Sequence, residues 1–137
     1  MATLSTDARN TACDAVTALL NAGAGSNPQL IIRTGAQAPL CTINLNGTDA
    51  VGDAAAGVAT VAPPAGEGSW VGYQINPSAD GVAADAVVVD KDATVVYTLT
   101  VGVTAGVDLQ LATVTLQTAV PITFSAAPTI TQLAAPA

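Results

Sequence analysis

The sequence predicts a mainly β fold, a jelly-roll-like antiparallel β-sandwich of about eight strands with one N-terminal α-helix. Around Val95–Val101, apolar residues alternate with threonines at a period of two, as a half-buried strand requires. Near the N-terminus, apolar residues recur every three or four positions instead, which is typical of an amphipathic helix. The other extended runs are short and separated by Gly- and Pro-rich turns, at the close spacing of sandwiches and barrels.

Length and composition indicate one domain, residues 1–137, with the helix at about 6–22 and the sandwich at about 29–133. A chain of 137 residues buries roughly two-thirds of the surface that its unfolded form exposes, which is enough for one core. Hydrophobic residues make up 50% of the chain but aromatic residues only 3%. We therefore expect a core of Val, Leu, Ile and Ala.

The low content of charged residues indicates that this chain is a component of a larger assembly. Only 9% of the residues are charged, whereas isolated soluble domains carry about 25%. A neutral exterior of this kind is typical of a surface that partners cover. The net charge of −7, with Arg9, Arg33 and Lys91 as the only cations, argues against binding to nucleic acid.

We expect no membrane contact and a cytoplasmic origin, because the apolar windows are short and the N-terminus lacks the pattern of a signal peptide. Cys13 and Cys41 have no CxxC spacing, and the chain contains no His. The favoured interpretation is two buried thiols, with a disulfide as the alternative and a metal or catalytic role as the least favoured.

The helix is expected to begin at Ser5–Asp7, which supplies capping side chains and a favourable negative charge, and to stop at Gly23. We expect Arg9 to lie off its apolar stripe. The stripe is predicted to pack against the sheet, or alternatively against a partner subunit, and Leu19→Asp is then expected to cost several kcal/mol. The apolar stripe consists of Ala8, Ala12, Val16, Leu19 and Leu20.

The first predicted hairpin joins Gln29–Thr34 to Pro39–Leu45 through a four-residue turn. Arg33 lies inside its first strand. We interpret Arg33 as an outward-facing residue paired loosely with a carboxylate, and the alternative is a contact with a neighbouring subunit.

The middle of the chain predicts two short strands, Val58–Ala62 and Ser69–Ile75, separated by a Pro- and Gly-rich loop. Trp70 and Tyr73 are two of the four aromatic residues in the sequence. They are interpreted as core anchors, with a subunit-interface role as the competing interpretation.

The clearest hairpin pairs Ala84–Val89 with Thr94–Gly102, at the centre of the predicted sheet, around a polar turn. Turns of this kind often carry Gly where Ala93 stands. Four more short extended runs are predicted after it: Val107–Leu111, Val114–Leu116, Val120–Phe124 and Pro128–Leu133.

Enzyme chemistry is largely missing from the sequence. Without His, neither a Ser-His-Asp nor a Cys-His nucleophile can form, and no phosphate-binding glycine motif is present. The carboxylate pairs Asp49 with Asp53 and Asp90 with Asp92 are interpreted as solvated turn residues. Asn46-Gly47-Thr48 matches the motif for N-glycosylation, but we expect no glycosylation there because the protein is expected to be made in the cytoplasm. We therefore predict no enzyme activity, cofactor or metal.

Two parts of the sequence carry a resemblance to a known family. The first is the opening LSTDARNTACDAVTALLNAGAG, with its Ala8-Arg9-Asn10 element, followed by the strand QLIIRTG that ends in Thr34-Gly35. The second is VVDKDATVVYTLTVG followed by GVDLQL, with Gly106, Asp108, Leu109 and Leu111. Together they resemble small virion proteins of tailed bacteriophages over about half of the chain, and residues 46–81 do not take part.

The resemblance implies a capsid cement or decoration protein with a jelly-roll-like sandwich and an N-terminal helix. The expected partners are the major capsid protein and further copies of the chain, as a dimer or trimer at capsid symmetry axes, on the outer capsid surface. Candidate subunit-interface residues are Arg9, Arg33, Trp70 and Tyr73. A tail or fibre component that binds a host receptor is the alternative, and an enzyme inhibitor or sugar-binding module comes third.

Overall fold

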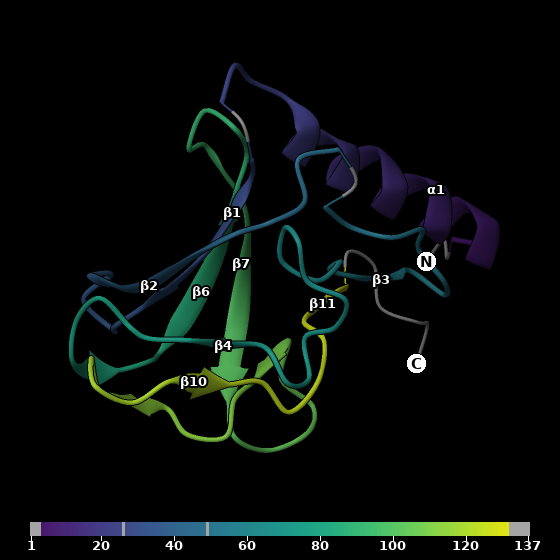
Figure 1. The fold of residues 1–137 in the computed structure, drawn as a ribbon. Helices are drawn as coiled ribbons and strands as arrows, with labels where there is room; N and C mark the ends of the chain where they lie inside the picture. Colours follow the sequence, from purple (N-terminus) through teal and green to yellow (C-terminus); the bar gives the residue numbers. More distant parts are fainter. Residues whose placement is uncertain (1–3, 26, 49, 132–137) are drawn as a thin grey trace.

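The fold is mainly β with one N-terminal helix, as the sequence predicts (Figure 1). The computed structural model describes residues 4–25, 27–48 and 50–131. The helical part is α1 (Thr6–Thr17), extended by a 3₁₀ turn, η1 (Ala18–Asn21). The strands are β1 (Gln29–Arg33), β2 (Pro39–Asn44), β3 (Val58–Thr60), β4 (Gln74–Ile75), β5 (Gly81–Val82), β6 (Asp85–Val89), β7 (Val95–Gly102), β8 (Leu109–Gln110), β9 (Thr115–Leu116), β10 (Ile122–Thr123) and β11 (Thr129–Thr131).

A five-stranded sheet with the order β2-β1-β6-β7-β8 forms the centre of the fold. Both predicted hairpins are confirmed: β1 pairs antiparallel with β2, and β6 pairs antiparallel with β7. β8 instead runs parallel to β7, which differs from the antiparallel prediction. The Asp108 carboxylate holds this connection, because it accepts hydrogen bonds from the backbone N–H of Thr100, at 2.9 Å, and from its hydroxyl, at 3.1 Å.

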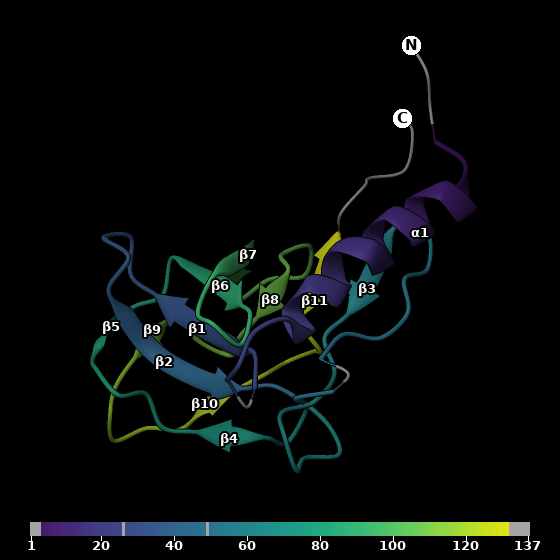
Figure 2. The same cartoon turned by 90° about the horizontal axis from the view of Figure 1, so that it is seen from above.

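The sheet curls into a half-barrel, which Figure 2 shows from above. Beyond β8 the ladder continues through a bridge between Leu111 and Phe124 to the antiparallel pair of β10 and β4. After β4 the chain returns to β2, the edge strand of the five-stranded sheet, where the Ser78 N–H donates to the Leu40 carbonyl at 2.8 Å. The described strands outnumber the eight or so predicted, and β5 is the one among them that lies outside every predicted extended run, because a two-residue strand is too short to show a period of two in the sequence.

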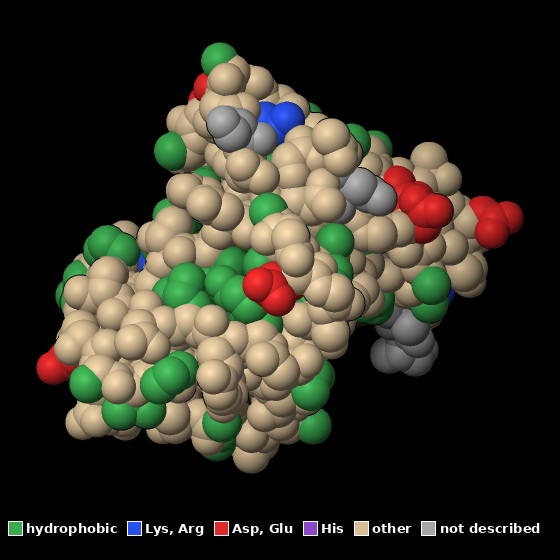
Figure 3. Space-filling view, viewed as in Figure 1, with side chains coloured by type: hydrophobic (Ala, Val, Ile, Leu, Met, Phe, Trp, Pro, Cys, Tyr) green, Lys and Arg blue, Asp and Glu red, His purple; other side chains and the backbone are tan. Residues whose placement is uncertain are grey.

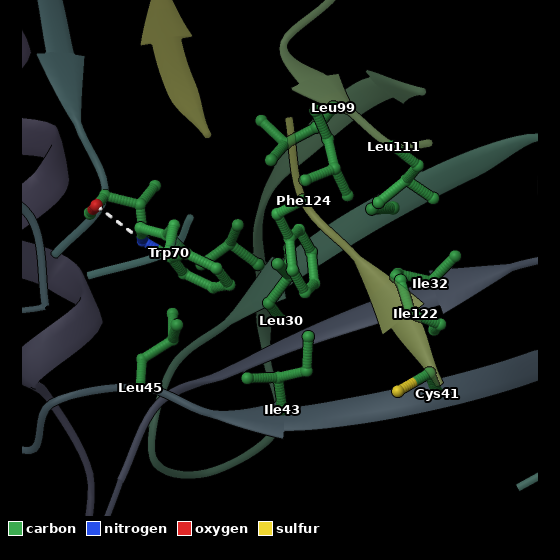
Figure 4. Close-up of a cluster of buried hydrophobic side chains, with 14 of the residues drawn as sticks. Leu30, Ile32, Cys41, Ile43, Leu45, Trp70, Leu99, Leu111, Ile122 and Phe124 are labelled. Atoms are coloured by element: carbon green, nitrogen blue, oxygen red, sulfur yellow. Dashed lines mark hydrogen bonds between the residues drawn. The ribbon is translucent and has the colours of Figure 1, made fainter. Parts of the chain in front are cut away.

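The hydrophobic core fills the concave side of this half-barrel (Figure 4). Side chains from β1 and β2 face side chains from β10 across it, and Trp70 closes one end. As the composition predicts, most core residues are aliphatic. Among the largest of the buried side chains are Leu20, Leu30, Ile32, Leu40, Ile43, Leu45, Leu109, Leu111 and Ile130.

The helix is present where the sequence predicts it, but its predicted buried stripe is only partly right: Ala8, Ala12 and Val16 are half-buried. The Ser5 hydroxyl caps it by accepting from the Ala8 N–H at 3.2 Å. The buried positions of α1 and η1 are Arg9, Cys13, Thr17 and Leu20, whereas Leu19 is 53% exposed. Of the predicted stripe, only Leu20 is fully buried.

Polar contacts explain why the helix is rotated away from the predicted orientation. Three of its side chains bind the backbone of the 54–57 turn: Arg9 Nη1 donates to the Ala56 carbonyl at 3.1 Å, Asn10 Oδ1 accepts from Gly57 N–H at 2.9 Å, and Asp14 Oδ1 accepts from Ala54 N–H at 2.7 Å. Backbone groups of a tight turn need such partners. The spacing of apolar residues along the helix does not reveal these hydrogen bonds, so it did not predict which face of the helix is buried.

The central hairpin turns through Asp90–Thr94. The Asp90 carboxylate accepts from the backbone N–H groups of Asp92 and Thr94, both at 2.9 Å, so this carboxylate has the turn role predicted for it. Ala93 has φ +65°, the left-handed conformation that favours glycine, which explains why Gly is the expected residue there. Asp49, from the other predicted carboxylate pair, lies outside the described residues.

The strand predicted at Ser69–Ile75 is mostly wrong. Only β4, its last two residues, is extended, and residues 70–73 form a turn in which Tyr73 N–H donates to the Trp70 carbonyl at 3.2 Å. Gly72 in this turn has φ +94°, a conformation that glycine adopts without strain. The final strand prediction, Pro128–Leu133, is observed as β11, and its last two residues lie outside the described part.

Candidate interaction surface

Three of the four aromatic residues, Trp70, Tyr73 and Phe124, form a cluster inside the half-barrel. The Trp70 ring lies 5.0 Å from the Phe124 ring and 6.1 Å from the Tyr73 ring, both edge to face. Trp70 is 2% exposed, and its Nε1–H donates to the Val61 and Ala62 carbonyls at 2.9 and 3.0 Å. Tyr73 is half-buried, and burial is the main cause of its raised pKa. Trp70 is thus a core anchor in this structure and presents no surface to a partner.

The two arginines are engaged within the chain. Arg33 binds Asp85, its cross-strand neighbour on β6, through Nε at 2.9 Å and Nη2 at 2.8 Å. The hydrogen bond to Asp85 raises the pKa of Arg33. The pair is bidentate, so it is more ordered than the loose pairing predicted. Arg9 is 7% exposed, and its Nε is buried without a hydrogen-bond partner.

None of the four predicted interface residues therefore offers a large exposed contact, and the structure does not bring them together into one site. The exposed aliphatic side chains are different ones. Seven large aliphatic residues in the described ranges are between 49% and 62% exposed. They are Leu4, Leu19, Val71, Val82, Val95, Val103 and Val120.

Two of these seven, Val82 and Val120, belong to one region beside β9, which we call the β9 surface. Val82 on β5 is the cross-strand partner of Thr115 on β9. Thr115 lines a groove of about 240 Å³ in which Val120 also takes part. The lining residues carry no charge: Thr113, Thr115, Leu116, Gln117, Val120, Pro121 and Ile122.

Short hydrogen bonds hold the β9 surface in place. Ala83 N–H donates to the Val114 carbonyl at 2.8 Å and joins β5 to β9. The following turn closes where Val120 N–H donates to the Gln117 carbonyl at 3.0 Å, and the Asp80 carboxylate accepts from Thr118 N–H at 2.7 Å. The groove is smaller than the roughly 300–1,000 Å³ pockets that hold small-molecule ligands. It suits a few apolar side chains of a protein partner.

Charge is sparse over the face shown in Figure 3. Asp and Glu atoms appear at a few separate points, Lys and Arg atoms at fewer, and small hydrophobic groups lie among uncharged polar and backbone atoms. Among the residues that the structure describes, no group of three or more metal-binding side chains gathers. The described helices include none that is both long and apolar enough to cross a membrane.

The sequence contains little that marks the β9 surface. The predicted runs Val114–Leu116 and Val120–Phe124 contain Thr115 and Val120, but in such short runs no period separates an exposed face from a buried one, and Val82 lies outside every predicted run. Proline favours the beginnings and edges of strands, so Pro121 is the one residue whose type indicates that this segment lies near the surface.

Both cysteines are buried thiols, as predicted. Burial raises the pKa of the Cys41 thiol from 9.0 to about 11. For Tyr97, burial is again the main cause, with a smaller contribution from Cys13, and it raises the pKa from 10.0 to about 12. Both groups therefore stay protonated in the folded chain at neutral pH.

The raised pKa values of Cys41 and Tyr97 predict that the protein loses stability at alkaline pH. The folded chain holds both protons more tightly than the unfolded chain, so the stability is fully present below pH 9.0 and falls as the pH rises through about 11 and 12. Urea unfolding at a series of pH values should show this decline. Cys41→Val should weaken it between pH 9.0 and about 11, and an unchanged slope in that variant would contradict the assignment to Cys41.

No family model, curated protein or solved structure matches this chain.

Proposed function

We propose that this chain is a capsid cement or decoration protein of a tailed bacteriophage. In this proposal it binds the outer surface of the head, bridges neighbouring major capsid subunits and acts as a dimer or trimer at symmetry axes. The observation that carries the proposal is the β9 surface, an uncharged groove with half-exposed aliphatic residues on a small, well-packed scaffold. The resemblance of the N-terminal helix region and of the central hairpin supports it from the sequence.

In this role the stabilisation of the shell is the sum of many small contributions. A pressurised shell is held together by many weak contacts, and a small rigid protein that contacts two subunits stabilises the assembled state alone. The jelly-roll-like sandwich belongs to the same proposal: the five-stranded sheet would be one layer, and the β4–β10 pair across the core would be part of the other. Nothing in this role requires a catalytic group or a cofactor.

Binding should depend on the β9 surface and little on salt. Val120→Asp places a charge in the uncharged groove, and an unpaired charge that a partner then buries is costly. We expect this variant to fold normally and to lose binding to particles that lack the protein, as measured by co-sedimentation. Because the lining residues are uncharged, wild-type binding should vary little across salt concentrations.

Val103→Asp is the matched control. Val103 is 49% exposed and Val120 is 50% exposed, but Val103 is not among the residues that line the groove. Equal binding losses in the two variants, or binding that disappears with salt, would contradict the assignment of the β9 surface. Electron microscopy of particles carrying a label on this chain then separates head from tail, and a label on the tail or fibres would favour the adhesin alternative.

A further inference from the structure

Asn46, Gly47 and Thr48 lie in the loop after β2, and no role described above uses them. The Asn46 side-chain oxygen, Oδ1, accepts two hydrogen bonds from Thr48, one from the backbone N–H at 2.9 Å and one from the hydroxyl at 3.0 Å. This arrangement folds the Asn46 amide back over the Gly47 peptide. It therefore holds the side-chain carbonyl carbon, Cγ, on the side of the Gly47 backbone nitrogen.

The same two hydrogen bonds make Cγ a better electrophile. Donors aimed at a carbonyl oxygen stabilise the negative charge that develops there when a nucleophile attacks the carbon. Gly47 has no side chain to hinder its own nitrogen, and no other Asn in the sequence is followed by Gly. Asn46 and Gly47 are partly exposed and Thr48 is exposed, so water reaches the loop.

From this geometry we infer that Asn46-Gly47 is a site of spontaneous self-modification, at which Asn46 becomes aspartate or isoaspartate. The Gly47 nitrogen gives its proton to hydroxide and bonds to Asn46 Cγ, and the Cγ–Nδ2 bond breaks to release ammonia. A five-membered succinimide results. Water then opens either carbonyl of the ring, so one water enters and one ammonia leaves in the whole reaction, with no change of oxidation state.

The two products differ in their effect on the fold. Aspartate keeps the acceptor oxygen for both Thr48 donors and adds one negative charge to a chain of net charge −7. Isoaspartate adds a methylene group to the main chain two residues after the end of β2. The modification would thus change the connection from the sheet edge to the 54–57 turn that holds α1.

Peptide mass spectrometry of the folded chain, incubated in warm and mildly alkaline buffer, tests this inference. We expect conversion at Asn46 to be at least as fast in the folded chain as in a urea-unfolded sample, and the other Asn residues to stay intact when folded. Thr48→Val, which keeps the backbone donor and removes the hydroxyl, should slow the conversion severalfold. Gly47→Ala should remove most of it.

Circular dichroism checks that each variant remains folded. Conversion in the unfolded sample but not in the folded one would overturn the inference, because the loop would then protect Asn46. Faster conversion in Thr48→Val would overturn it as well, since the hydroxyl would then shield the amide. Neither result would bear on the proposed capsid role.

Discussion

Leu20→Asp is expected to unfold most of the protein, whereas Leu19→Asp is expected to leave it folded. Leu20 is 0% exposed and belongs to the main core cluster, so the substitution removes an aliphatic side chain and buries an unpaired charge. Changes of this kind cost about 4 kcal/mol or more, out of a typical total stability of about 5–15 kcal/mol. Leu19 is 53% exposed, and surface substitutions usually stay within about 0.5 kcal/mol.

The pair is well matched, because both variants introduce the same charge at adjacent positions of η1. Urea unfolding followed by circular dichroism measures the two costs. Equally large losses of stability in both variants would mean that Leu19 is buried beside Leu20, as in the stripe predicted from the sequence, and that the helix does not pack through the face of Arg9, Cys13 and Thr17. Such a result would contradict the helix orientation described above.

Gly25→Ala is expected to destabilise the protein strongly through a backbone clash. A Cβ atom at Gly25 would overlap the Lys91 carbonyl oxygen and lie 3.2 Å from its carbon, and a backbone carbonyl cannot turn aside as a flexible side chain can. The link between η1 and β1 would have to move away from the central hairpin turn, where Ala24 N–H now donates to Asp92 Oδ1 at 3.0 Å. We expect a loss of about 2–3 kcal/mol, at the upper end of overpacking costs.

Gly68→Ala is the control for this substitution. A Cβ at Gly68 meets no atom within 4 Å, and the residue is not in the left-handed conformation. Its replacement by Ala should be neutral or stabilise by about 0.5 kcal/mol, because it lowers the entropy of the unfolded chain. Equal melting temperatures for Gly25→Ala and wild type would show that the linker does not pack on the hairpin turn.

The elements with strong local patterns were predictable from the sequence. The hairpins of β1 with β2 and of β6 with β7 have β-branched runs and polar turns, and the helix has a capping serine and a glycine stop. The face that the helix buries was not predictable in this way. It depends on hydrogen bonds from Arg9, Asn10 and Asp14 to a turn about 40 or more residues away, which helical periodicity does not register.

The site predictions depended on residue type, and residue type alone did not separate core from surface. Trp70 serves core and interface equally well by its chemistry, and the structure places it in the core because Phe124 and the Val61 carbonyl converge on it. Arg33 is fixed by its register opposite Asp85, a pairing of strands 52 positions apart. The β9 surface arises from the pairing of two very short strands, β5 and β9, in which Val82 lies opposite Thr115.

The heat resistance of particles assembled without this chain tests the proposed role most directly. We predict that such particles assemble and package DNA but release it at a lower temperature, or after milder osmotic shock, than particles with the chain. Added purified protein should restore resistance, and the Val120→Asp variant should not. Particles that lack the chain and are as heat-resistant as wild type, yet fail to adsorb to their host, would contradict the cement role and favour a receptor-binding tail component.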